Sequence, residues 1–344
     1  MKSAAEFVRE PFGLSRLPMR VGLGQFNELS EERLRFIKQC GVDDFLLNTP
    51  VLPGEDFWEY EDLAALREKA ESYDLRLMAL ENVPTHFYDE IMLGKPGRER
   101  QLENMCRTVR NMGRAGIPIL GYHFMPTGVW RTSRTTPIRG GANTTAFNLS
   151  DATADSGSKF QKRSSARVDR QYTDDEMWAN YDWYMERILA VCEEANVRMA
   201  LHPDDPPVNY PLGGVARLFR NFDNFRRAFD RFDSPMHGLD FCHGCWSEMK
   251  GGDGVLDAIR HFGGAGKIFY VHLRDVQGAV EDFNECWIGE GNSNIRDVLQ
   301  TLKDVGFNGF MIPDHVPRME GDTDWSHRGR AYTIGYMKAM LEVL

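Results

Sequence analysis

The stretch Leu201-His202-Pro203-Asp204-Asp205-Pro206-Pro207 decides the fold. It follows the mostly apolar run 197–201, which we interpret as a β-strand, so His202 stands just beyond the carboxyl end of that strand. Side chains of metal-binding type end three later strand-like runs in the same way, at Cys242, His272 and Asp314. In barrel enzymes the carboxyl ends of the strands carry the chemistry. The four positions therefore predict a barrel with its site at one rim.

Strand-like runs and helical patterns alternate along the chain outward from this stretch. We predict strands at 19–23, 44–48, 75–81, 117–123, 197–201, 238–241, 267–271 and 309–312. We predict helices at 31–40, 61–73, 98–115, 174–195, 215–230, 255–262, 295–305 and 327–341. Ser30 has the position of a helix cap, and Thr173 with Glu176 forms a capping box. Eight such units predict an α/β fold, a (β/α)8 TIM barrel formed by one domain over 1–344.

A long segment after the fourth strand interrupts this alternation. Residues 127–171 are rich in Ser, Thr, Arg, Gly and Asn and show no convincing period, so we predict an inserted loop on the side of the site. Two interpretations stay open, a disordered excursion and a lid over the barrel mouth. Arg131, Arg134 and Arg139 favour a lid that meets an anionic substrate.

Composition and charge exclude several classes of protein. With 344 residues, 42% of them hydrophobic, the chain is long enough for one large barrel domain. A net charge of −10 argues against nucleic acid as a partner, because binding to phosphates needs clustered Lys and Arg. The sequence shows neither a signal peptide nor a membrane span, which predicts a cytoplasmic protein without a membrane partner. The six scattered cysteines are typical of reduced thiols, so Cys242 is available as a ligand.

The four strand-end residues predict a site for one divalent metal ion. His202, Cys242, His272 and Asp314 offer two imidazoles, a thiolate and a carboxylate at successive equivalent positions. Each residue alone would more often be a hydrogen-bonded structural residue, and only the equivalence of the four positions favours a metal. Imidazole with thiolate suits Zn²⁺, Fe²⁺ or Co²⁺, and the carboxylate also admits Mn²⁺. Substrate binding requires the coordination number to expand, which favours Mn²⁺ or Fe²⁺ over a closed tetrahedral Zn²⁺ site.

Other polar side chains are expected at the same barrel mouth. His315 adjoins Asp314 and is the first candidate for a general acid or base. Arg274, two residues beyond His272, is a candidate for binding a substrate carboxylate. Asp204 has two open interpretations, a hydrogen bond that orients His202 and a cap of the turn. Further candidates for the substrate side are Asn82, His86, His123 and Arg131.

These motifs together resemble the mannonate dehydratase family of the xylose-isomerase-like barrel superfamily. The resemblance lies in HPDDPP at 202–207, HLRD at 272–275, PDH at 313–315, ENVP at 81–84 and Tyr122-His123-Phe124-Met125-Pro126. It implies dehydration of the sugar acid D-mannonate to 2-keto-3-deoxy-D-gluconate and water, with Mn²⁺ as the usual metal. It also implies the same four metal ligands that the strand ends select. Barrels of this superfamily commonly form dimers or tetramers, so a homo-oligomer is expected.

The resemblance also suggests catalytic residues. The catalytic histidine of the family maps to His315, and the family's downstream tyrosine is nearest to Tyr332, with Tyr336 as a competitor. Hypothetically, His315 and Tyr332 divide the proton transfers between them. The chain departs from the family pattern on the substrate side, where His123 replaces an asparagine and 20–25 replaces an aromatic first strand.

Two other functions stay open. One is a metal-dependent isomerase, epimerase or lyase acting on a related sugar or keto-sugar, because one fold can host different reactions. The other is a catalytically inactive barrel that binds a carbohydrate or zinc.

Overall fold

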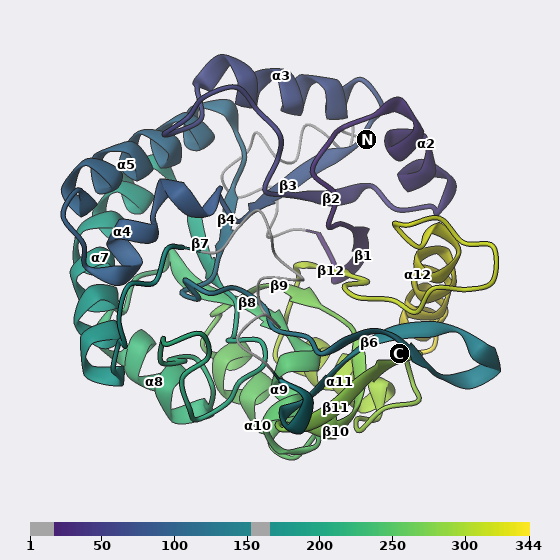
Figure 1. Ribbon diagram of the computed structural model, residues 1–344. Helices are drawn as coiled ribbons and strands as arrows, with labels where there is room; N and C mark the ends of the chain where they lie inside the picture. The colour runs from purple at the N-terminus through teal and green to yellow at the C-terminus, as the bar shows by residue number, and fades with distance from the viewer. Residues whose placement is uncertain (1–16, 153–165) are drawn as a thin grey trace.

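Eight parallel strands close into a barrel in the order β1-β12-β9-β8-β7-β4-β3-β2 (Figure 1). The computed structural model describes residues 17–152 and 166–344. The barrel strands are β1 Arg20–Leu23, β2 Asp44–Asn48, β3 Arg76–Glu81, β4 Ile119–Tyr122, β7 Arg198–Leu201, β8 His237–Cys242, β9 Ile268–His272 and β12 Phe310–Ile312. Each lies within two residues of a predicted strand at either end, and the predicted (β/α)8 barrel is confirmed.

Helices surround the barrel on its outer side (Figure 1). They are α2 Glu31–Gln39, α3 Tyr60–Glu71, α4 Asp89–Leu93, α5 Arg98–Ala115, α7 Asp174–Ala195, α8 Phe222–Arg231, α9 His243–Lys250, α10 Val255–Ala258, α11 Ile295–Asp304 and α12 His327–Glu342. The side chain of Ser30 caps α2, and Thr173 and Glu176 form the predicted capping box of α7. Among the described residues, no helix is long and apolar enough to cross a membrane.

One helix prediction was wrong, and two helices, α4 and α9, were not predicted. The predicted helix at 215–230 begins only at Phe222, because the side chain of Asn221 accepts a hydrogen bond from the Asn224 amide and caps the helix there. The helix α9 was missed, since it follows β8 directly, without a loop between them.

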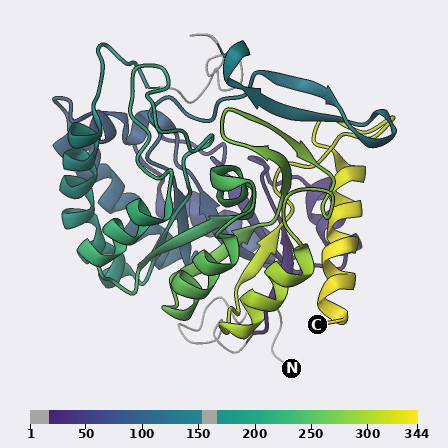
Figure 2. The ribbon, with the colours of Figure 1, turned by 90° about the horizontal axis from the view of Figure 1, so that it is seen from below.

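An antiparallel sheet of four strands lies at the carboxyl end of the barrel. We call it the accessory sheet. Its order is β10-β11-β6-β5, and its strands are β5 Ser133–Pro137, β6 Asn143–Asn148, β10 Asp275–Ala279 and β11 Asp282–Cys286. Figure 2 shows it at the end of the barrel opposite the carboxyl terminus of α12. The prediction of an irregular loop at 127–171 was therefore wrong for β5 and β6, whereas 153–165 lie outside the described residues.

Apolar side chains fill the barrel interior. Leu46, Met78, Ile119, Phe269, Tyr270, Phe310 and Ile312 form the cluster inside the strands. A larger apolar cluster includes side chains of the strands and of the surrounding helices. Because these side chains are mostly apolar, the polar groups able to bind a substrate are expected at the ends of the strands.

A buried ion cluster ties three strands together at the amino end of the barrel. Asp44, the first residue of β2, is fully buried. One of its carboxylate oxygens pairs with Arg20 on β1, and the other pairs with Arg76 on β3. The carboxylate thus neutralises two guanidinium groups, each of which is itself mostly buried.

Replacing Asp44 with alanine should destabilise the barrel. The variant leaves two largely buried guanidinium groups without their carboxylate, and breaking a buried pair in this way costs about 3–5 kcal/mol. Unfolding in urea, followed by circular dichroism, should show a clearly lower midpoint. The neighbouring Asp43→Ala is the control, because Asp43 pairs with Lys38 at the surface, where a pair contributes less than about 1 kcal/mol. Equal midpoints for the two variants would contradict a stabilising role for the Asp44 cluster.

Candidate metal centre and active site

The structure brings the four predicted ligands together at one rim of the barrel. One ligand atom each of His202, Cys242 and His272 lies within 4.8 Å of the other two. An Asp314 oxygen lies 3.9 Å from the Cys242 sulfur and 3.8 Å from Nδ1 of His272. Cys242 and His272 end adjacent strands and stand side by side in the register of β8 and β9. Parallel strands that end at one rim therefore account for the cluster.

Neighbouring carboxylates orient the His272 ring. Its Nε2 donates a hydrogen bond to Glu81 at 2.9 Å and lies 3.3 Å from Asp240. Nδ1 consequently faces the cluster, where it is buried without a hydrogen-bond partner. Oδ1 of Asp314 is likewise buried without a hydrogen bond, although Nε2 of His315 lies 3.7 Å from it. A buried polar atom without a hydrogen bond is costly, and a metal ion bound by Nδ1 of His272 would satisfy that nitrogen.

The His202 ring is oriented by a hydrogen bond to the backbone of the next residue. Its Nδ1 donates to the carbonyl of Pro203 at 2.6 Å, so Nε2 is the nitrogen available to a metal ion. Burial opposes ionisation of the Cys242 thiol, but a hydrogen bond from Cys245 and the charge of Arg274 hold the pKa of Cys242 well below its usual range. Cys242 is therefore a thiolate, the form that binds metals.

The cluster carries a surplus of negative charge. Burial lowers the pKa of His202, but the charge and hydrogen bond of Cys242 together with the charge of Asp240 raise that pKa to about 10. Burial also opposes protonation of His272, whereas Asp240 and Glu81 raise its pKa well above the usual range. The negative charges that raise the pKa values of these two imidazoles would also attract a divalent cation bound between them. The residues present thus fit a metal ion, although its identity does not follow from them.

A polar pocket opens beside the cluster. Its lining residues are Gln25, Asn48, Thr49, Glu81, Asn82, Val83, Thr85, His123, Met125, Val129, His202, Asp205, Asp314 and His315. Hydroxyl, amide and imidazole groups of this kind can hydrogen-bond to the hydroxyl groups of a sugar acid. Gln25, Asn48 and Thr49 were not predicted, although Asn48 ends β2 and Gln25 and Thr49 come just after β1 and β2, as the predicted residues stand at the ends of later strands.

The imidazole rings of His123 and His315 both line the pocket, but they make different hydrogen bonds. Burial lowers the pKa of His123 to about 3, so the ring that replaces the family's amide is neutral at neutral pH. Its Nδ1 accepts a hydrogen bond from the Met125 amide. Nδ1 of His315 donates to Glu285 at 2.5 Å, while its Nε2 lies 3.7 Å from Asp314. His315 thus stands between the metal cluster and the accessory sheet.

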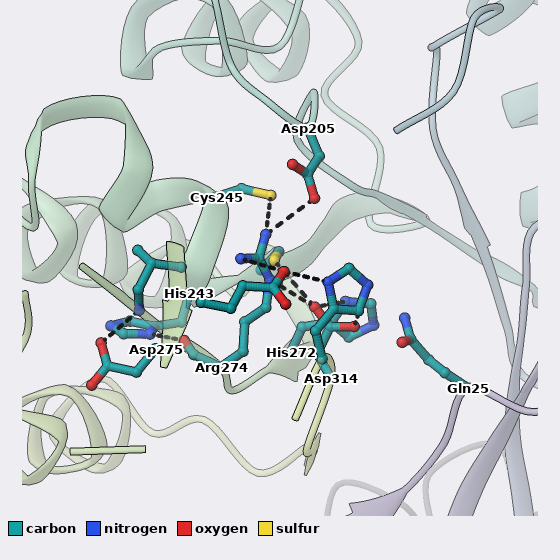
Figure 3. A network of polar contacts seen from close by, with 12 residues as sticks. Gln25, Asp205, His243, Cys245, His272, Arg274, Asp275 and Asp314 are labelled. Carbon is teal, nitrogen blue, oxygen red and sulfur yellow. Dashed lines mark hydrogen bonds and ion pairs between the residues drawn. The ribbon is translucent and has the colours of Figure 1, made fainter. Parts of the chain in front are cut away.

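Arg274 and Arg131 are buried and bound by carboxylates of the chain. Arg274 lies 3.1 Å from Asp205 and 2.9 Å from Asp314 (Figure 3). It also lies 2.7 Å from Glu248. Arg131 binds both oxygens of Asp205, at 2.5 and 2.8 Å. Neither arginine is among the residues lining the pocket. Their predicted contact with a substrate carboxylate stays a prediction, and the contacts seen are structural.

Three other predicted residues do not reach the pocket lining. Asp204 accepts a hydrogen bond from the Phe219 amide, so its contact holds the loop after β7. Nε2 of His86 donates to the carbonyl of Glu55 at 2.8 Å. Tyr332 on α12 is 40% exposed, and its ring packs edge-on against Trp287. Tyr332 is not among the residues lining the pocket, and its catalytic role stays a prediction.

The chain is similar to known proteins of one family. A family model described as D-mannonate dehydratase (UxuA) matches residues 19–344. Mannonate dehydratase 2 of Halalkalibacterium halodurans is 29% identical over 343 residues, which cover 91% of this chain and 93% of the relative. The mannonate dehydratase of Thermotoga maritima is 30% identical over 316 residues, 84% of each chain.

Solved structures show the same relationship. The crystal structure of mannonate dehydratase from Streptococcus suis serotype 2 superposes with a TM-score of 0.81 at 28% identity, covering 93% of this chain and 94% of that chain. A xylose isomerase domain protein from Planctomyces limnophilus is 13% identical with a TM-score of 0.60, covers 93% and 97% of the two chains, and shares the fold alone. The family match over nearly the whole chain decides the relationship: the protein belongs to the D-mannonate dehydratase family, a family of hydro-lyases that dehydrate sugar acids.

Proposed function

We propose that this chain dehydrates D-mannonate to 2-keto-3-deoxy-D-gluconate and water, with a divalent metal ion held by His202, Cys242, His272 and Asp314. The observation that carries the proposal is the convergence of these four side chains beside a polar pocket that His315 also lines. Membership of the family supports the reaction class. Mn²⁺ is the metal we propose first, because the resemblance implies it as the usual metal and because a six-coordinate ion leaves room for substrate oxygens.

The reaction removes a proton from C2 of the sugar acid and a hydroxyl group from C3. The proton alpha to a carboxylate is weakly acidic, and a bound divalent ion would act as a Lewis acid that polarises the substrate's oxygens. The residues of the chain bind and orient the acid. Asn48, Thr49 and Asn82 line the pocket and can hold sugar hydroxyl groups.

His315 is the proposed proton-transfer residue. It lines the pocket, and its Nδ1 is engaged by Glu285, so Nε2 is the atom able to accept or donate a proton. A second group must make the opposite transfer. The resemblance suggests Tyr332 for it, but its exposed position on α12 gives that assignment no support.

The metal site is tested by Cys242→Ala. Loss of the thiolate removes one of four ligands, so we expect the purified variant to contain much less Mn²⁺, Fe²⁺, Co²⁺ or Zn²⁺ than the wild type, measured by mass spectrometry of the metals. Chelation of the wild type should abolish turnover, and Mn²⁺ should restore it. Cys106→Ala is the matched control, because Cys106 lies on α5, outside the cluster. Equal metal content in Cys242→Ala and wild type would exclude the proposed site.

The reaction is tested by His315→Asn in an assay of 2-keto acid formed from D-mannonate and a panel of other aldonates. We expect kcat to fall roughly 10²- to 10⁴-fold, the usual contribution of a positioned acid or base. The metal content should stay at the wild-type value, because His315 is not a proposed ligand. If the metal-loaded wild type formed no 2-keto acid from any aldonate, the dehydratase proposal would be wrong. If the wild type formed 2-keto acid and His315→Asn formed it at the same rate, the assignment of His315 would be wrong.

A further inference from the structure

Glu285 reaches from the accessory sheet into the active site. It is the fourth residue of β11, outside the barrel, and it is only 1% exposed. Its Oε1 accepts the hydrogen bond from Nδ1 of His315 at 2.5 Å. An ionised carboxylate is only an acceptor, so this contact requires the hydrogen of the imidazole to sit on Nδ1. Nε2 of His315 is then left on the side of Asp314 and the pocket.

The Glu285 carboxylate is itself held on both oxygens. Arg131 donates to Oε1 at 3.0 Å, and the Thr145 hydroxyl donates to Oε2 at 2.6 Å. Thr145 lies on β6, which pairs with β11 in the accessory sheet. Arg131 is fixed in turn by both oxygens of Asp205, in the loop after β7. The carboxylate therefore meets His315 in one fixed position.

We propose that Glu285 is a positioning residue for His315: the accessory sheet holds the imidazole in one tautomer and one orientation. The inference deepens the proposed function and rests on the role of His315 in it. An imidazole without this partner rotates and exchanges between two tautomers, only one of which leaves Nε2 free to take a proton. In other enzymes too, a third group that hydrogen-bonds to a catalytic base holds it in the orientation needed for proton transfer.

A purely structural role for Glu285 is the competing explanation. Glu285 is a counter-ion of the buried Arg131, and its loss could simply loosen the accessory sheet. The two explanations differ in what depends on His315. A positioning residue acts only while His315 is present, whereas a structural residue acts regardless of it.

The experiment is a double-mutant cycle of Glu285→Ala, His315→Asn and the variant with both changes. With D-mannonate as substrate, Glu285→Ala should lower kcat roughly 10- to 100-fold, within the total that a positioned acid or base contributes, and leave KM nearly unchanged. Adding Glu285→Ala to His315→Asn should lower kcat no further, because the group it positions is already gone. Metal content should stay at the wild-type value throughout the cycle.

A second variant guards against misfolding. Glu285→Gln keeps an oxygen that accepts from Arg131 and from His315, so it should fold as the wild type does and lose less activity than Glu285→Ala. Glu290→Gln is the matched control, because Glu290 pairs with the exposed Arg139 near the same sheet. It should turn over like the wild type.

The outcomes separate the two proposals. Multiplication of the two single effects in the double variant, or near-normal kcat in Glu285→Ala, would overturn the positioning role of Glu285. Normal kcat in His315→Asn itself would instead overturn the proposed catalytic role of His315, on which the inference rests, while the proposed dehydration of D-mannonate is tested separately by the wild-type assay. Equal losses of kcat in Glu285→Gln and Glu285→Ala, together with lowered thermal midpoints in both, would assign Glu285 a structural role.

Discussion

The rest of the site depends on the ion pairs made by the buried guanidinium of Arg274. It joins Glu248 of α9, Asp205 of the loop after β7 and the proposed metal ligand Asp314 after β12. These segments are far apart in sequence, and a charge buried this deeply is tolerated only with its partners in place. Its positive charge also helps to keep Cys242 a thiolate. One side chain thus joins the segments around the proposed metal site and contributes to its charge balance.

The sequence was most informative where function follows from strand position. His202, Cys242, His272 and Asp314 could be recognised because each ends a strand-like run and because parallel strands end at one rim. The same reasoning covers Gln25 just after β1 and Asn48 at the end of β2, which line the pocket and were overlooked. Most of the residues at the site could therefore be predicted from where the strands end, because the position of the backbone alone brings these residues together.

Contacts between distant segments could not be predicted in this way. The strands β5 and β6 are short, polar and partly exposed, so they lack the apolar alternation that marks a strand. Glu285 and Thr145 are 140 residues apart, and no local pattern shows that they meet. Arg131 looked available for a substrate because its carboxylate partners lie in other segments. Tyr332 was chosen by register along the chain, whereas exposure depends on how α12 packs.

The accessory sheet supplies no proposed metal ligand and yet is joined to the metal site. The proposed ligands belong to the barrel, whereas the carboxylate that meets His315 belongs to a hairpin outside it. Glu285 of that hairpin pairs with Arg131, and Arg131 pairs with Asp205. Asp205 pairs in turn with Arg274, which contacts the proposed ligand Asp314. A change of charge in the hairpin is therefore felt at the proposed ligands through this chain of buried ion pairs.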